Sequence, residues 1–140
     1  MDKYFEPINR LYLSQPFAEM GNEGELDRCL HIAEAYALAE NAIVSMGDFV
    51  RNCSYCFFGG LADLLGLSAE ERCPTIPSLY EEFIFSRANQ DDLMLRHAHE
   101  LAYIHLTEKK TPDERRNYIL SDNLRMRDKD GVWRSVRHRM

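Results

Sequence analysis

The residues ILSDNLRMR (119–127), DKDG (128–131) and VWRSVRHRM (132–140) decide the fold that we predict for this chain. The apolar residues that share one parity are Leu120, Leu124 and Met126 in the first stretch and Val132, Val136 and Met140 in the second. Successive side chains of a strand point to opposite faces of a sheet, so this alternation predicts two half-buried strands. A short polar turn ending in Gly131 joins them, and the whole stretch predicts an antiparallel β-hairpin.

The composition is that of one globular domain. The chain has 140 residues, of which 45% are hydrophobic and 29% charged, and this length suffices for a core without disulfides. Seventeen lysines and arginines stand against 23 aspartates and glutamates, which gives a net charge of −6. An acidic domain does not attract nucleic acid through its overall charge.

The N-terminal residues and the lack of a long apolar run predict a cytoplasmic protein with reduced cysteines. The N-terminus, MDKYFEP, has no apolar stretch of the kind found in a signal peptide. No run approaches the roughly 18 apolar residues that a membrane-spanning helix needs. We therefore expect the four cysteines to be reduced.

The first half of the chain predicts an arm, a helix and two strands. Residues 1–24 mix aromatic residues with prolines and glycines and are expected to form a lead-in arm. From Glu25 the apolar spacing is helical. The residues of that amphipathic stripe are Leu26, Leu30, Ala33 and Ala37. Residues 42–49 and 54–58 are expected to be strands joined by a turn.

Several helices are expected between this strand pair and the hairpin. Residues 61–65 form a short helix that Gly66 ends. Ser78 and Glu81 have the spacing of a capping box, and Asn89 begins the longest helix, which runs to about residue 109. The sequence 111–114 caps one more turn, with a proline in its first turn. The order of elements indicates an α+β fold with antiparallel strand pairs.

This order, together with three local phrases, resembles the PAS family of sensory domains. NAIVSMGDF (41–49) is similar to the first PAS strand and its turn, and YCFFGGLADLLGL (55–67) to the second strand and following helix. LRMRDKDGVWR (124–134) is similar to the family's late hairpin. The sequence 91–93 resembles the family's entry to the long helix, although the usual proline is absent. The resemblance implies an antiparallel sheet with helices packed on one face, preceded by an amphipathic helix.

A closer resemblance is to the N-terminal sensor regions of Bacteroides-type LuxR-family transcriptional regulators. Residues 111–120, with PDERRNY, carry it. In such regulators a further strand, a linker and a DNA-binding helix-turn-helix follow, and this chain contains none of them. We therefore expect residues 1–40 to form the N-terminal arm and amphipathic helix, and residues 41–140 a PAS-like domain that lacks its final strand.

In PAS domains the space between sheet and helices holds a small molecule or is filled by side chains. Strand parity and helix spacing predict which residues face this space. The candidate ligand-binding residues are Tyr55, Phe57, His97, Leu101, His105 and Val136. Either His97 or His105 is the polar element that a pocket would use.

The cysteine and histidine patterns do not require a cofactor. Cys53 and Cys56 have no second pair to complete a zinc site, so we expect packing cysteines and no metal. Cys53 precedes the position of the reactive cysteine in flavin-binding PAS sensors, which argues against a flavin. Haem-binding PAS sensors take an axial histidine from the long helix, and His97 or His105 is the candidate for that alternative. We expect no cofactor.

Catalytic motifs are absent from the sequence, so we expect no enzyme. No nucleophile elbow, zinc-protease motif or phosphate-binding loop occurs. The arginines of the hairpin form a possible basic stripe, which is either a site for an anion or acidic helix or simply a solvated face. These residues are Arg125, Arg127, Arg137 and Arg139.

The leading hypothesis is a sensory and dimerisation region of a bacterial LuxR-type transcription regulator. It would form a homodimer through the apolar stripe of residues 26–37 and bind a small ligand or a partner. It would contact DNA only through a C-terminal helix-turn-helix domain that is absent from this chain, and it would not contact a membrane. The alternatives are a PAS sensor of a histidine kinase or other signalling enzyme, and a haem- or cofactor-binding sensor.

Overall fold

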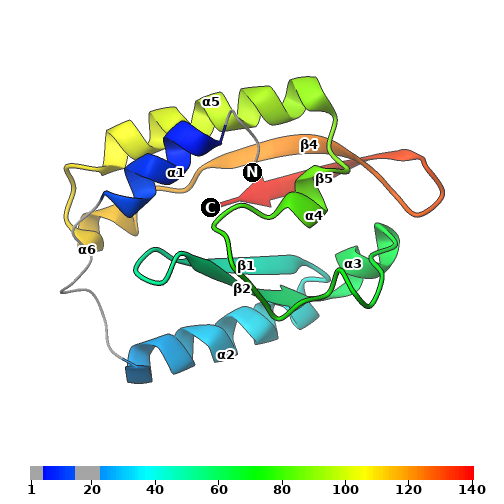
Figure 1. Cartoon of the computed structure of the whole chain (residues 1–140), viewed down its shortest axis with the longest axis horizontal. Helices are drawn as coiled ribbons and strands as arrows, with labels where there is room; N and C mark the ends of the chain where they lie inside the picture. The colour runs from blue at the N-terminus through cyan, green and yellow to red at the C-terminus, as the bar shows by residue number, and fades with distance from the viewer. Residues whose placement is uncertain (1–4, 15–22) are drawn as a thin grey trace.

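The computed structural model describes residues 5–14 and 23–140 and has a mixed α+β fold (Figure 1). The α+β class with an N-terminal helix, expected from the sequence, is confirmed. In chain order the elements are α1 (Glu6–Leu13), α2 (Glu23–Ala39), β1 (Ile43–Asp48), β2 (Cys53–Phe58), α3 (Gly60–Leu64), β3 (Thr75–Ile76), α4 (Glu82–Phe85), α5 (Gln90–Thr107), α6 (Pro112–Arg115), β4 (Ser121–Arg127) and β5 (Trp133–Arg139).

The predicted hairpin is confirmed as β4 and β5, which pair antiparallel with Leu124 opposite Val136. Leu124 is buried, as the alternation of apolar residues predicts. The turn is held by Asp128, whose carboxylate accepts a hydrogen bond from the backbone N–H of Val132 at 2.9 Å. Gly131 has a φ of 77°, a backbone conformation that costs glycine nothing because it has no Cβ.

The first predicted strand pair is confirmed as β1 and β2, which are antiparallel with Ser45 opposite Cys56. Asp48 closes the turn after β1, since its Oδ1 accepts a hydrogen bond from the backbone N–H of Arg51 at 3.0 Å. On β2, Ser54 and Cys56 are buried and therefore mark the face that points into the core. The short strand β3 pairs with the other edge of β2.

The strands form two sheets, which corrects the expectation of a single one. One sheet has the order β1-β2-β3, and the other consists of β4 and β5. In Figure 1 the β4–β5 pair runs beside α5, and the β1–β2 pair runs beside α2. The sheets are separate because no strand in the described part of the chain pairs with the second edge of β1 or of β5.

The N-terminal segment contains a helix where an arm was expected. The aromatic and apolar residues Phe5, Ile8 and Tyr12 are buried in the same core as Leu124 of β4. Pro7 lies in the first turn of α1, where a missing N–H does not disturb the helix. The part of the expected arm at residues 1–4 and 15–22 lies outside the described residues.

The expected helix is confirmed as α2, and part of its expected apolar stripe packs on the first sheet. Ala33 and Ala37 are buried, and the helix contacts β1 and β2. Of the stripe that was expected to pair with a second copy of the chain, Ala33 and Ala37 are thus covered by this chain's own sheet, whereas Leu26 and Leu30 are half-buried. Other apolar side chains of α2, such as Ile32 and Tyr36, remain exposed.

Helix-capping residues fix where three helices begin or end, as predicted. The side chain of Asn89 accepts hydrogen bonds from the first turn of α5, including the N–H of Asp92 at 3.2 Å. Thr111 and Glu114 form a reciprocal capping box at α6. Gly66, with a φ of 70°, follows the C-terminal cap of α3.

The capping box predicted at Ser78 and Glu81 is wrong. Ser78 lies in a loop, where its carbonyl oxygen accepts a hydrogen bond from the buried Ser54 hydroxyl at 2.8 Å. The Ser78 hydroxyl accepts from the N–H of Tyr80 at 3.0 Å, and α4 begins only after Glu81. The tertiary contact with β2 therefore overrides the local helix signal.

Gly59 occupies a close backbone contact between the end of α2 and the junction of β2 with α3. Its N–H donates to the carbonyl oxygen of Ala42 at 2.7 Å. A Cβ at this position would lie 2.0 Å from the carbonyl oxygen of Ala37 and 2.7 Å from that of Ala42. Both neighbours are backbone atoms, so no side-chain rotation relieves the clash.

We predict that Gly59→Ala lowers the free energy of unfolding by about 3 kcal/mol or more, because the helix must move away from the strand. Gly131→Ala is the matched control: its Cβ meets open space, and its positive φ alone costs about 1 kcal/mol. Urea unfolding of both variants measures the difference. Equal losses for the two variants would contradict the close packing at Gly59.

Candidate functional site

Polar side chains from distant parts of the chain meet beneath α5. Arg96, His97 and Glu100 lie on the buried face of α5, Tyr12 comes from α1, and His138 comes from β5. Residues three or four positions apart share one face of a helix, which brings the three α5 side chains together. We call these five residues the Arg96 cluster.

The guanidinium of Arg96 lies at the centre of the cluster. One of its terminal nitrogens donates a hydrogen bond to Glu100, and the same nitrogen lies 3.3 Å from Nδ1 of His97. The other terminal nitrogen lies 3.3 Å from Nε2 of His138. Tyr12 donates its hydroxyl to the second oxygen of Glu100 at 2.6 Å. The cluster therefore connects α1, α5 and β5 through hydrogen bonds.

The contact with Arg96 indicates which ring nitrogen of His138 carries the proton. Arginine only donates hydrogen bonds, so the His138 nitrogen that faces it is an acceptor and the ring proton is on Nδ1. Burial, together with the nearby positive charge of Arg96, lowers the pKa of His138 to about 4. Burial and the carboxylate of Glu100 raise the pKa of Tyr12. At neutral pH the imidazole of His138 and the phenol of Tyr12 are thus uncharged.

Aromatic rings enclose the charged centre. The ring of Phe85 lies under the guanidinium of Arg96, 4.8 Å from ring centroid to carbon, in a cation–π contact. The His97 ring has Phe5, Tyr80 and Phe85 around it, with centroid distances of 5.8, 5.9 and 6.4 Å. The apolar surroundings strengthen the hydrogen bonds and ion pair inside.

Glu81 extends the polar region toward β1. Its carboxyl group hydrogen-bonds to Ser45 of β1, and burial raises its pKa. The positive charge of Arg96 acts on Glu81 in the opposite direction. Polar side chains therefore reach the core from the β1 side through Glu81 as well as from β5 through His138.

Buried polar atoms at the site that make no hydrogen bond to any described residue include Nε of Arg96, Nδ1 of His138 and Oδ2 of Asp122. Asp122 lies opposite His138 across β4 and β5, and its other oxygen lies 2.5 Å from Nδ1 of His99. Buried polar atoms of this kind are uncommon in folded proteins. Chemically, they offer two donors and one acceptor to a small polar molecule.

Three of the predicted ligand-binding residues lie in the Arg96 cluster or against the apolar core beside it. His97 belongs to the Arg96 cluster, and Leu101 and Val136 pack against the buried apolar residues of the core. That these three residues contact a ligand stays a prediction.

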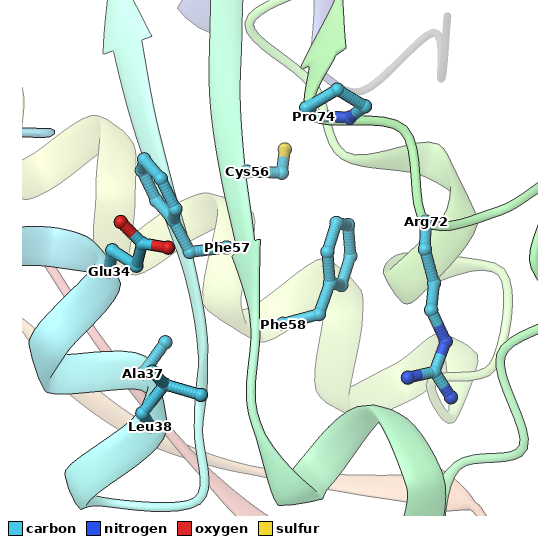
Figure 2. A pocket seen from close by; sticks show the side chains of 8 residues that line it. All are labelled: Glu34, Ala37, Leu38, Cys56, Phe57, Phe58, Arg72 and Pro74. Carbon is cyan, nitrogen blue, oxygen red and sulfur yellow. The ribbon is translucent and has the colours of Figure 1, made fainter.

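The other three predicted residues lie elsewhere. Tyr55 alternates with the buried Ser54 on β2, and its hydroxyl donates to Asp48 at 3.3 Å. Phe57 points toward α2 (Figure 2). The His105 side chain is 57% exposed and lies 3.7 Å from Glu108. The structure therefore does not bring these residues to the Arg96 cluster.

A shallow cavity of about 210 Å³ lies between α2, β2 and the loop before β3 (Figure 2). Its lining residues are Glu34, Ala37, Leu38, Cys56, Phe57, Phe58, Arg72 and Pro74. In Figure 2 Phe57 points to the α2 side, whereas Phe58 points toward Arg72. The cavity is smaller than the roughly 300–1,000 Å³ of most small-molecule pockets, and no residue of the Arg96 cluster lines it.

The cysteine motif has a packing role at Cys56. The Cys56 thiol is buried beside the Ser45 hydroxyl, at 3.8 Å, and burial raises its pKa to about 11. A thiol with such a pKa is a poor nucleophile at neutral pH. All four cysteines are free thiols.

The arginine stripe of the hairpin lies on the exposed face. Arg125 donates to the carboxylate of Asp92 on α5 at 2.8 Å, and Arg127 lies over the ring of Trp133 at 4.9 Å. Arg137 is exposed. One of the four arginines is thus occupied by an ion pair that joins β4 to α5.

Sequence reasoning missed most of the Arg96 cluster. Arg96 and Glu100 are four residues apart on a helix, and this spacing was the one available signal for an ion pair. Tyr12 is separated from Glu100 by 88 positions and His138 from Arg96 by 42, so no local pattern connects them.

The described residues contain no group of three or more histidine, cysteine or acidic side chains that could hold a metal ion. Within the same ranges, no helix has the length and apolar character needed to cross a bilayer. Comparison with models of known protein families and with curated protein sequences gave no match.

We predict that Glu100→Leu lowers the free energy of unfolding by about 3–5 kcal/mol, because Arg96 then stays buried without its carboxylate. Adding Arg96→Met should recover most of this loss, since both charges are then replaced by apolar groups. Urea unfolding measures both values. Arg116→Ala, which removes a largely exposed ion pair with Asp113, is the control and should cost less than about 1 kcal/mol. A loss for Glu100→Leu no larger than that of the control would contradict this account.

We also predict a pH dependence from His138. Its pKa is 6.5 ordinarily and about 4 in the folded chain, so between these values the unfolded chain binds a proton that the folded chain does not. The contribution of neutral His138 to the free energy of unfolding is therefore fully present above pH 6.5, and about 3 kcal/mol of it is lost as the pH is lowered to 4.

His138→Gln keeps an acceptor for Arg96 but cannot titrate, so it should flatten the loss of stability between pH 6.5 and 4. His105→Gln removes an exposed histidine of α5 and should leave the profile unchanged. Urea unfolding at a series of pH values gives both profiles. Identical profiles for wild type and His138→Gln would show that His138 does not cause the acid sensitivity.

Proposed function

We propose that this chain is a PAS-like sensory domain of a bacterial LuxR-type transcription regulator and that it performs no catalysis. It binds a small polar ligand or a partner and relays that event to a DNA-binding domain outside these 140 residues. The Arg96 cluster is the observation that carries the proposal, because a single charged centre joins three elements of the core.

The relay follows from the partners of Arg96. Tyr12 of α1 and His138 of β5 contact the same ion pair on α5. Arg96 also lies 3.9 Å from the sulfur of Met140, directly after β5. A ligand that competes for one of these hydrogen bonds changes the others, and the shift reaches the end of the β-hairpin.

The ligand is a small molecule with both donor and acceptor groups. It would satisfy the buried atoms Arg96 Nε, His138 Nδ1 and Asp122 Oδ2, which hydrogen-bond to no described residue. His97 belongs to the same cluster, Leu101 and Val136 pack against the adjoining apolar core, and all three keep their proposed role as ligand contacts. Because α1 packs over the cluster through Tyr12, entry of the ligand involves movement of α1.

Two alternatives make different predictions. The same domain in a histidine kinase or another signalling enzyme would relay through the same cluster to another output. A haem sensor would use His97, but the rings of Phe5, Tyr80 and Phe85 that enclose it would have to move apart. An intense haem absorbance band in the purified protein, lost in His97→Ala, would favour the haem alternative.

The relay is tested by fusing the chain after Met140 to a LuxR-type DNA-binding domain and measuring transcription from its promoter. The double substitution Arg96→Met with Glu100→Leu should change transcription by about tenfold, a typical size for coupling between sites. The surface substitution Arg116→Ala should match wild type. Equal transcription from all three folded fusions would contradict the proposed relay.

A further inference from the structure

Helix α5 carries an apolar stripe on the face opposite the Arg96 cluster. Met94, Leu95 and Leu106 are 49%, 58% and 55% exposed, although each is large and apolar. Ala98 and Ala102 lie between them on the same side of the helix and are also exposed. Exposed apolar patches of this kind mark interaction surfaces. We call these five residues the α5 stripe.

The stripe has the spacing of a helix-pairing seam. The positions 91, 95, 98, 102, 105 and 109 are separated alternately by four and three residues, which is the spacing of packed helices. The apolar members are Leu95, Ala98 and Ala102, while Asp91 and His105 are polar and Lys109 lies just past the end of α5. Small side chains occupy the centre of the seam and larger ones lie toward its ends. Two such helices can approach closely where the alanines meet.

The charges at the two ends of the seam favour a second copy of this chain in antiparallel orientation. Asp91 is exposed at the start of α5, and Lys109 is exposed just after its end. In an antiparallel pair centred between Ala98 and Ala102, Asp91 of each copy lies next to Lys109 of the other. Leu95 of each copy then packs near Leu106 of the other. A parallel pair would instead place like charges together at both ends.

The exposed face of α2 is the competing surface. It carries Ile32 and Tyr36, on the opposite side of the molecule from α5 (Figure 1). An antiparallel pair of α2 helices would bring Glu25 of one copy toward Glu40 of the other, which are like charges. Charge complementarity therefore selects α5 over α2 as the surface for self-association.

We propose that the chain forms a twofold-symmetric homodimer in which the α5 stripes of two copies pack antiparallel. The inference keeps the homodimer expected from the sequence and places its contact on α5 instead of α2. Each contact occurs twice, because the same patch of both copies forms a twofold interface.

Sedimentation velocity of the 140-residue chain tests the surface. Wild type should be dimeric at high concentration, and Leu95→Glu with Ala102→Glu should be monomeric because four carboxylates would meet at the seam. Ile32→Glu on α2 is the matched control and should remain dimeric. Because the substituted side chains are exposed, circular dichroism should show a folded chain in every case.

A charge exchange tests the orientation. Asp91→Lys should weaken the dimer about tenfold, because two favourable pairs become repulsive. Adding Lys109→Asp restores opposite charges in an antiparallel pair and should return the dissociation constant to near the wild-type value. In a parallel pair the double variant would still place like charges together and would not be rescued.

The outcomes separate this inference from the sensory role. A dimer that persists in Leu95→Glu/Ala102→Glu, or that dissociates in Ile32→Glu, would overturn the α5 surface. A wild-type chain that stays monomeric at its highest attainable concentration would overturn the homodimer as well. A fusion that still responds to Arg96→Met/Glu100→Leu in that case would leave the proposed relay intact.

Discussion

The buried ion pair between Arg96 and Glu100 needs hydrogen bonds from other parts of the chain, and the docking of α1 and β5 on α5 supplies them. Removing a charged side chain from water costs several kcal/mol, and the partner charge offsets this only when further hydrogen bonds complete the site. Tyr12 and His138 supply such bonds to Glu100 and Arg96 from other parts of the chain. The pair is therefore stable only when α1, α5 and β5 are docked together. Apolar contacts alone would tolerate more sliding between these elements.

Because the strands form two sheets, no β-ladder joins the halves of the fold, and side-chain packing in the core holds much of the contact between them. Within each sheet the strands share backbone hydrogen bonds, but no described strand bridges β1 and β5. The core contains Leu124 and Met126 of the second sheet, with Ile43 and Phe58 of the first packed against it. Backbone hydrogen bonds between the halves lie outside the β-ladders: the N–H of Lys129 in the hairpin turn donates to the carbonyl oxygen of Leu64 in α3 at 3.0 Å.

Local sequence patterns predicted the elements whose signals are local. The hairpin followed from strict alternation, and the start of α5 followed from the capping side chain of Asn89. Helix α1 was missed because Pro7 suggested a turn, although Phe5, Ile8 and Tyr12 have helical spacing. The candidate site was predicted in part, since helix spacing selected His97 and hairpin parity selected Val136. The four-residue spacing of Arg96 and Glu100 also allowed an ion pair, whereas Tyr12 and His138 join the cluster through long-range packing, which no spacing rule contains.

The two faces of helix α5 have different roles. The buried face of α5 combines the apolar residues Leu93 and Ile104 with the charged residues Arg96 and Glu100, whereas Leu95 and Leu106 point outward. An ordinary surface helix keeps its charges in water and its large apolar side chains inside, because apolar side chains gain most from burial. The buried charges of α5 connect to α1 and β5, and its outward apolar side chains need a partner to leave water. Because a helix moves as a rigid rod, any change at the Arg96 cluster that rotates α5 also reorients the outer stripe. In the dimer that we propose, the sensing site and the subunit contact would therefore be coupled through one helix.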